Sequence, residues 1–189
     1  MNPCEELPRS VEYNGHFYHI CPEWPNVLLA IRALDDESLS EAEQLRTACA
    51  LLLGDKVPAS AELLKAVFDT INPEKPAKIE QPVMDYFQDW DLIYSGFWQA
   101  YGIDLTKRCD LHWMQFVALV KGLPENTRFA DVVSIRQMDI PEPNKHNAKQ
   151  RQHIIEMKLK YALKRPSKPF KSGLESLFFA FKSQAERGE

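Results

Sequence analysis

The sequence predicts a mostly α-helical protein, a multi-helix bundle with a short N-terminal β-hairpin packed on it. Three observations support this fold class. Apolar residues recur at the three- and four-residue spacing of a helix along most of the chain. Glycine and proline end several of these segments, and an Asn-Gly pair near the N-terminus joins two segments in which apolar residues alternate. With 189 residues, of which 44% are hydrophobic, the chain can form one large core or two small ones.

The hairpin is predicted for residues 7–20. Asn14 and Gly15 both accept the positive φ angles of a type I′ turn, and they stand between two alternating segments. A single hairpin is only marginally stable in water, so we expect it to pack on the helices. The alternating residues are Val11, Tyr13, His16, Tyr18 and Ile20.

Three helices are predicted to follow, up to residue 71. The first has Pro25 in its first turn. The second opens with a capping box formed by Ser40 and Glu43, and it ends at Gly54. Ser60 is expected to cap the third. Their expected buried residues are, in order, Val27, Leu28, Ile31 and Leu34; Ala42, Leu45, Cys49 and Leu52; and Leu63, Leu64, Val67, Phe68 and Ile71.

Residues 72–82 contain three prolines and no helical period, which is typical of a linker. The predicted organisation is a segment 1–71 with the hairpin and three helices, the linker 72–82, an aromatic helical segment 83–163 that includes a basic helix, and a C-terminal tail 164–189. One compact domain overall remains the alternative.

The aromatic segment is concentrated between Asp85 and Arg136, which holds three of the four tryptophans. A helix is expected from Tyr86, and Gly102 can end it in the left-handed conformation. Asp110 can cap a second helix, and a shorter third one is expected from Thr127.

Two more helices are predicted beyond Pro143. Asn144 is expected to cap a long basic helix. The tail segment 172–185 has apolar residues at i, i+3, i+4 and i+7, so it is expected to be an amphipathic helix that is flexible, docks on its own core or binds a partner. These apolar residues are Leu174, Leu177, Phe178 and Phe181.

The charge is unevenly distributed along the chain. Residues 1–91 hold 7 basic and 17 acidic residues, whereas residues 144–189 hold 11 basic and 4 acidic ones. Such asymmetry suits self-association or a charged partner. Solvated helix faces are the simpler explanation, and we favour it.

No motif of enzymatic or cofactor chemistry is present. The sequence lacks GxxxxGK[ST], GxGxxG, GxSxG and HExxH. His16 and His19 fall on opposite faces of the predicted strand, so no metal site is expected. The four cysteines form no CxxC pair, which favours reduced thiols over disulfides. We therefore expect a protein without catalytic activity, cofactor or metal.

Membrane insertion and secretion are not expected either. No apolar run approaches the roughly 20 residues that span a bilayer, and the acidic N-terminus lacks the apolar stretch of a secretory signal. The protein should stay in the compartment where it is made.

Nucleic-acid binding is the remaining alternative suggested by the residues. Residues 145–171 are strongly basic, and such a stripe could neutralise several phosphates. The whole chain is nevertheless acidic, with a pI near 5.8, which is unlike a dedicated DNA-binding protein. We therefore consider binding of nucleic acid unlikely.

The aromatic segment resembles a known family. Its elements are DYFQDWDLIYSGFWQAYGIDL (Asp85–Leu105), LHWMQFVALVKGLPENTRFADVVSIR (Leu111–Arg136) and KYAL (Lys160–Leu163). Together with LPRSVEYNGHFYHI at the N-terminus and LLLGDKVP before the second half, they resemble the bacteriophage gene-product-fifteen family of siphophage and prophage tail regions. The resemblance covers most of residues 7–163. The motif residues are Asp91, Trp98, Tyr101, Gly102, Asp104, Trp113, Phe116, Ile135 and Arg136.

The resemblance implies a tail assembly chaperone or scaffold in the host cytoplasm that binds tail proteins, above all the tape-measure protein, without catalysis. A structural minor tail protein is the alternative within the same class. We expect Trp98, Tyr101, Trp113 and Phe116 to lie in the core, and Arg136 to cap carbonyls or pair with Asp91 or Asp104. The expected protein-interaction residues are Lys149, Arg151, Lys158, Leu174, Leu177, Phe178 and Phe181.

Overall fold

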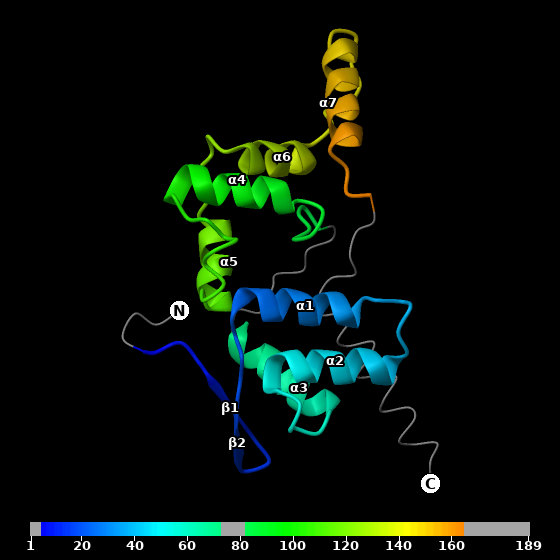
Figure 1. The fold of residues 1–189 in the computed structure, drawn as a ribbon. Helices are drawn as coiled ribbons and strands as arrows, with labels where there is room; N and C mark the ends of the chain where they lie inside the picture. Colours follow the sequence, from blue (N-terminus) through cyan, green and yellow to red (C-terminus); the bar gives the residue numbers. More distant parts are fainter. Residues whose placement is uncertain (1–4, 73–81, 165–189) are drawn as a thin grey trace. The chain divides into compact units, whose positions relative to one another are not determined.

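The computed structural model describes residues 5–72 and 82–164 (Figure 1). In these residues a two-stranded antiparallel hairpin is followed by seven helices, which confirms the predicted mostly α class. None of these helices has the length and apolar character needed to cross a membrane. The elements are β1 (Ser10–Tyr13), β2 (His16–His19), α1 (Trp24–Leu34), α2 (Glu41–Leu53), α3 (Ala61–Ile71), α4 (Trp90–Tyr101), α5 (Trp113–Lys121), α6 (Arg128–Gln137) and α7 (Ala148–Lys160).

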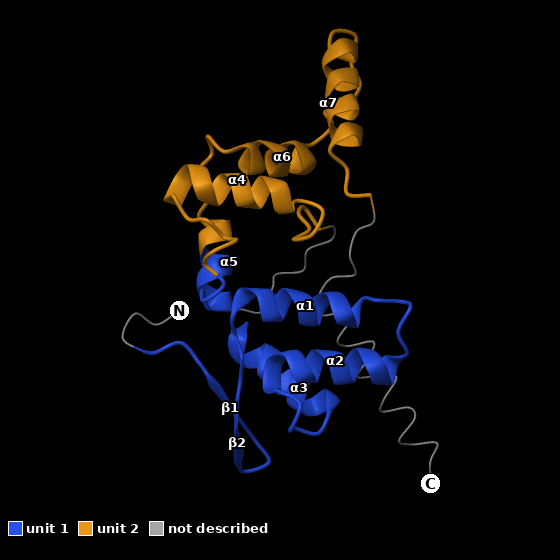
Figure 2. Ribbon diagram, viewed as in Figure 1, with its two compact units in different colours: residues 1–78, 109–118, 167–189 blue, residues 79–108, 119–166 orange. Residues whose placement is uncertain are grey.

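The described residues form two compact units (Figure 2). Residues 5–72 and 109–118 belong to the first unit, and residues 82–108 and 119–164 belong to the second. Helix α5 begins in the first unit and ends in the second. Residues 109–118 therefore pack with the N-terminal helices, although in sequence they lie within the aromatic segment.

The hairpin has the predicted turn. Tyr13 pairs with His16, and the two residues between them adopt positive φ angles, 52° at Asn14 and 75° at Gly15. Val11 is buried and β1 packs against α3. The expected docking of the hairpin on the helices is thus confirmed.

Helices α1 and α2 lie side by side in the first unit (Figure 1). The predicted capping box is present, because the backbone N–H of Ser40 donates to Glu43 Oε2 at 2.9 Å while Ser40 Oγ accepts from the N–H of Glu43. The expected burial is confirmed at most positions, but Ala42 is exposed and Ile31 is half-buried. Ala42 lies in the exposed first turn of α2, whereas Ala48, further along the helix, is buried.

An aromatic cluster joins the first half of α5 to α1. The rings of Trp24 and Phe116 stack with centroids 5.2 Å apart, and those of Trp113 and Phe116 lie 5.7 Å apart. Trp113 Nε1 donates to Asn72 Oδ1 at 2.8 Å. The predicted core positions of Trp113 and Phe116 are confirmed.

Helix α5 starts later than expected because the residues before it bond to the backbone ahead of α1. Trp24 N donates to Leu111 O at 3.0 Å, and Trp113 N donates to Pro22 O at 2.7 Å. An isolated β-bridge between Glu23 and His112 lies between these two bonds. The extended backbone of this bridge cannot be helical at the same time.

His112 is buried inside this bridge with both ring nitrogens occupied. Its Nδ1 lies 3.1 Å from the donating N–H of Met114, and its Nε2 lies 3.0 Å from Pro8 O. Nδ1 must therefore accept and Nε2 must carry the proton, as in a neutral ring. Burial lowers the pKa of His112, and the carbonyl of Pro8 opposes this shift only in part.

In the second unit, α4 begins at Trp90 rather than near Tyr86. Asp85 Oδ1 accepts from the N–H groups of Phe87 and Gln88, at 2.9 and 2.8 Å, and so holds a turn ahead of the helix. Gly102 ends α4 with φ 63° and ψ 20°, which confirms the predicted left-handed cap. The predicted cap of α6 at Thr127 is also confirmed.

The buried neutral state of His112 predicts that the protein loses stability in mild acid. Above pH ~6.5 the ring is neutral in the folded and the unfolded chain, and its contribution does not change. As the pH falls below that value, the unfolded chain binds a proton that the folded chain resists, so the free energy of unfolding decreases toward the lower folded pKa. Urea unfolding at pH 7.5, 6.5 and 5.5 measures this decrease.

The matched variants are His112→Gln and, as control, His153→Gln at an exposed position. We expect His112→Gln to be less stable at pH 7.5 and to lose less stability between pH 7.5 and 5.5. An unchanged pH dependence in His112→Gln would contradict the assignment.

Candidate protein-interaction site around the basic helix

Helix α7 is the basic helix predicted from the sequence, and none of its residues is buried. It begins at Ala148 after Asn147, not directly after Asn144. Asn144 instead shapes the preceding turn, since its N–H donates to Asn147 Oδ1 at 2.9 Å while Asn147 Nδ2 donates to Glu142 O at 2.8 Å.

Basic side chains attach α7 to the segment that leads away from α6. Arg151 Nη1 donates to the carbonyl of Pro141. Lys158 Nζ donates to the carbonyls of Arg136 and Met138, at 2.8 and 2.6 Å. The attachment therefore includes charge-assisted hydrogen bonds to backbone oxygens, and no residue of α7 is fully buried.

Arg136 is the centre of this attachment. Its two terminal nitrogens bind both carboxylate oxygens of Asp89, at 2.6 and 2.8 Å. The same guanidinium donates to Val83 O at 3.0 Å and to Tyr161 O at 2.6 Å. It thus joins the turn before α4, helix α6 and the end of α7.

The expectation for Arg136 is confirmed in one respect and wrong in the other. It does cap carbonyls, but its acidic partner is Asp89 rather than Asp91 or Asp104. Asp91 is exposed. Asp104 accepts from Thr106 Oγ1 at 2.6 Å and pairs with Lys107 at 3.3 Å, so it organises its own turn.

The expected interaction residues differ in their exposure and in the hydrogen bonds that they already form. Lys149 is exposed on α7. Arg151 and Lys158 are half-buried and already donate to carbonyls within the unit. The tail residues Leu174, Leu177, Phe178 and Phe181 lie outside the described residues.

Apolar side chains gather at α7 and the segment beside it. Leu159 is 72% exposed, Met138 43% and Ile140 41%. Ala148, Ile155 and Leu159 share one stripe of the helix, at i, i+7 and i+11.

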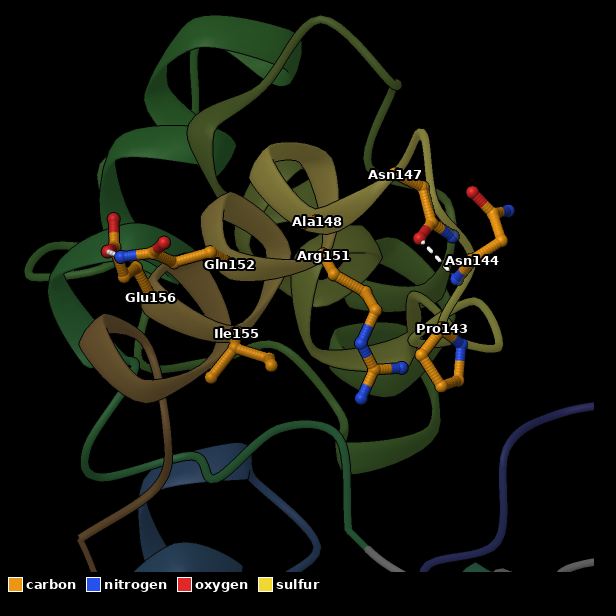
Figure 3. Close-up of a pocket in the computed structure, with 8 residues that line it drawn as sticks. All are labelled: Pro143, Asn144, Asn147, Ala148, Arg151, Gln152, Ile155 and Glu156. Atoms are coloured by element: carbon orange, nitrogen blue, oxygen red, sulfur yellow. Dashed lines mark hydrogen bonds between the residues drawn. The ribbon is translucent and has the colours of Figure 1, made fainter.

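A shallow pocket of about 320 Å³ lies along the first part of this stripe (Figure 3). In Figure 3 the side chains of Pro143, Arg151 and Ile155 project toward one side, whereas Gln152 bonds to Glu156 along the helix at 3.0 Å. The pocket residues are Pro143, Asn144, Asn147, Ala148, Arg151, Gln152, Ile155 and Glu156.

Trp98 is 56% exposed, so the prediction that it lies in the core is wrong. Helix α4 buries Ile93, Gly96 and Phe97, and a helix in one packed layer cannot also bury the opposite face. An exposed tryptophan is a common anchor of protein interfaces. Sequence periodicity missed this candidate because α4 is aromatic on nearly every side.

The other motif residues have local structural contacts. Tyr101 is half-buried, with its hydroxyl donating to Leu119 O at 2.9 Å and its ring edge-on to Phe97. Ile135 is half-buried on α6. None of these contacts arranges a nucleophile beside a base.

Metal or redox chemistry finds no support in the described residues. They contain no cluster of His, Cys, Asp and Glu that could hold a metal ion. Cys21 and Cys49 are free thiols. Burial raises the pKa of Cys49 and of Cys21, which keeps both thiols protonated and poorly reactive.

The comparisons with known proteins identify one family. Residues 4–163 match the family model described as bacteriophage Gp15 protein. No curated protein and no solved structure shows significant similarity to the chain.

The contacts of Arg136 predict a large loss of stability in Arg136→Ala. The side chain is 12% exposed and Asp89 is 3% exposed, so the substitution leaves a buried carboxylate without its cation. Such a loss costs about 3–5 kcal/mol in the free energy of unfolding. Arg136→Lys should recover only part of it, because an ammonium cannot bind both carboxylate oxygens and the carbonyls at once.

Urea unfolding measures this cost, and amide hydrogen exchange of residues 148–160 reports whether α7 detaches. The control is Asp131→Ala, which removes an exposed ion pair with Arg128 and should change stability by less than about 1 kcal/mol. Equal stabilities for Arg136→Ala and Asp131→Ala would refute the central role of Arg136.

Proposed function

Because the chain belongs to the bacteriophage Gp15 protein family, we propose that it is a tail assembly chaperone that binds the tape-measure protein in the host cytoplasm. Membership in this family points to a structural or assembly role in the phage. Tail assembly, the tape-measure partner and the location are our proposal beyond that coarser role. Binding is stoichiometric, and the protein needs neither catalysis nor a cofactor.

The exposed apolar surface of the second unit supports this proposal most directly. Large hydrophobic side chains are exposed at seven described positions, of which five lie in this unit. Three of them lie on α7 or on the segment bonded to it, and exposed apolar residues that are grouped in this way are typical of protein-binding surfaces. The five residues are Phe87, Trp98, Met138, Ile140 and Leu159.

A long helical partner fits this kind of surface. A tape-measure protein is a very long helical protein, and its apolar faces would aggregate before a tail tube encloses them. The stripe on α7 can shield such a face by helix–helix contact, with Lys149 beside it to pair with acidic side chains. The contacts are few and exposed, so each one is weak enough to be released during assembly.

The proposal predicts that co-expression keeps the tape-measure protein soluble in a complex with this chain. The measurement is pull-down followed by size determination. Leu159→Asp places a charge in the exposed stripe and should abolish most of the complex, as should Leu177→Asp or Phe181→Asp in the tail. The control, Gln150→Asp, adds the same charge on another face of α7 and should leave the complex intact.

An insoluble tape-measure protein with no complex would overturn the proposed partner. A structural minor tail protein is then the next hypothesis, and persistence of the chain in purified virions would favour it. The hypothesis of nucleic-acid binding through residues 145–171 is less favoured, because Arg151 and Lys158 already bond to carbonyls of the protein itself. A measurable DNA affinity that falls steeply with salt concentration would support that hypothesis.

A further inference from the structure

Helix α4, in the second unit, carries one stripe of exposed residues (Figure 2). Its members are spaced at i, i+4, i+7 and i+11, which places them on one side of the helix and its cap. In the part of the chain that the structure describes, the indole of Trp98 has no hydrogen-bond or ring partner and the carboxylate of Asp91 has no ion-pair partner. Both groups are therefore free to contact a ligand. The stripe consists of Asp91, Ser95, Trp98 and Gly102.

The charge around this stripe is negative. Residues 82–106 contain four aspartates and no lysine or arginine. Asp89 and Asp104 each pair with a basic residue that follows this segment, whereas Asp91 has no such partner among the described residues. The last turn of α4 has no basic residue either, so no cation of the helix itself offsets the partial negative charge of its C-terminus beside Trp98. This charge pattern favours a cationic ligand.

Arginine is the cation that suits the indole of Trp98 best. A guanidinium stacks on the face of an indole ring, which attracts positive charge, and it is more weakly hydrated than an ammonium. Ser95 and Gly102 lie about one turn before and after Trp98, and their small size lets a second helix come close. Asp91 lies two turns before Trp98, about 10.5 Å along the axis. A partner helix with basic side chains seven residues apart therefore reaches both groups.

We propose that this stripe of α4 is a second protein-interaction surface, and that it binds a helix of a partner protein through an arginine on Trp98 and a second basic residue, seven positions away, on Asp91. Trp98 supplies the stacking surface, and Asp91 fixes the register of the bound helix. The stripe of α7 presents Lys149 and so favours an acidic helix. The two surfaces thus select helices of opposite charge.

This inference goes beyond the proposed function, which places the tape-measure protein on the stripe of α7. It is tested with synthetic peptides and with changes on α4 alone. A failure of these peptides to bind leaves the tape-measure complex untouched, and a failure of that complex leaves peptide binding untouched. The two failures are therefore distinguishable.

Nuclear magnetic resonance of the full-length, isotope-labelled protein gives the test. Its four tryptophans give four indole N–H signals, and Trp98→Phe identifies the signal of Trp98 by its loss. The probe is an alanine-based helical peptide with two arginines seven residues apart. We expect it to shift the Trp98 signal with a Kd of about 1 mM or below, and to leave the signals of the buried Trp24 and Trp113 unchanged.

Three matched peptides test the proposed chemistry. Lysine in place of both arginines should weaken binding by about twofold or more, because an ammonium stacks less well on an indole. Glutamine in place of both should abolish the shift, because it removes the charge. Arginines five residues apart point to different sides of the peptide helix and should bind several-fold more weakly than arginines seven apart.

The protein variants are followed through the backbone amide signals of α4. Trp98→Ala should weaken binding of the arginine peptide by about fivefold, and Asp91→Asn by about twofold. The controls are Phe17→Ala, which removes another exposed aromatic ring, and Asp139→Asn, which removes another exposed carboxylate. Both controls should bind the peptide as the wild type does.

Three results would overturn the proposal. One is the absence of any Trp98 shift at millimolar arginine peptide. Another is equal binding of the arginine and glutamine peptides, or binding that Trp98→Ala leaves unchanged. The third is a Trp98 signal that moves when the protein alone is diluted, since the occupant of the stripe is then a second copy of the chain.

Discussion

The second unit depends on one buried ion pair, between Arg136 and Asp89. The guanidinium of Arg136 donates four hydrogen bonds: two to the carboxylate of Asp89, and one each to the carbonyls of Val83 and Tyr161. Only a planar guanidinium offers enough donors in fixed directions for this arrangement. The pair therefore positions the start of α4 and the end of α7 together, and both ends would lose their anchor without it.

Attachment by polar bonds has a consequence for the surface of α7. A helix that packs by apolar burial hides its hydrophobic stripe, whereas α7 is attached through Arg151 and Lys158 on an adjacent face. The stripe with Ile155 and Leu159 stays accessible. This accessible stripe is a candidate surface for the helical partner that we propose.

Some of the aromatic residues lie in the core, and others lie at the surface. Trp24, Trp113 and Phe116 stack in the core of the first unit, where their large area makes burial favourable. Trp98 lies on the outer face of α4 instead. Both groups contain motif residues of the bacteriophage family, so membership of a motif does not by itself distinguish a core position from a surface position.

The sequence alone determined the local structure. Asn14-Gly15 specified the hairpin turn, Ser40 and Glu43 the capping box, and Gly102 the end of α4, because each depends on the backbone preferences of a few adjacent residues. The helical class and most buried faces followed from periodicity in the same way. It also indicated the family through its motifs.

Only the tertiary structure decided the contacts between distant segments. Asp89, Asp91 and Asp104 are equivalent candidates in sequence, but the turn at Asp85 orients only Asp89 toward Arg136. Likewise, Trp98 and Phe97 are neighbours on one aromatic helix, and the packing of α4 on α6 buries one and exposes the other. Periodicity shows that a helix face is apolar. Whether that face is buried depends on which element packs against it, and this packing is set by contacts between residues far apart in the chain.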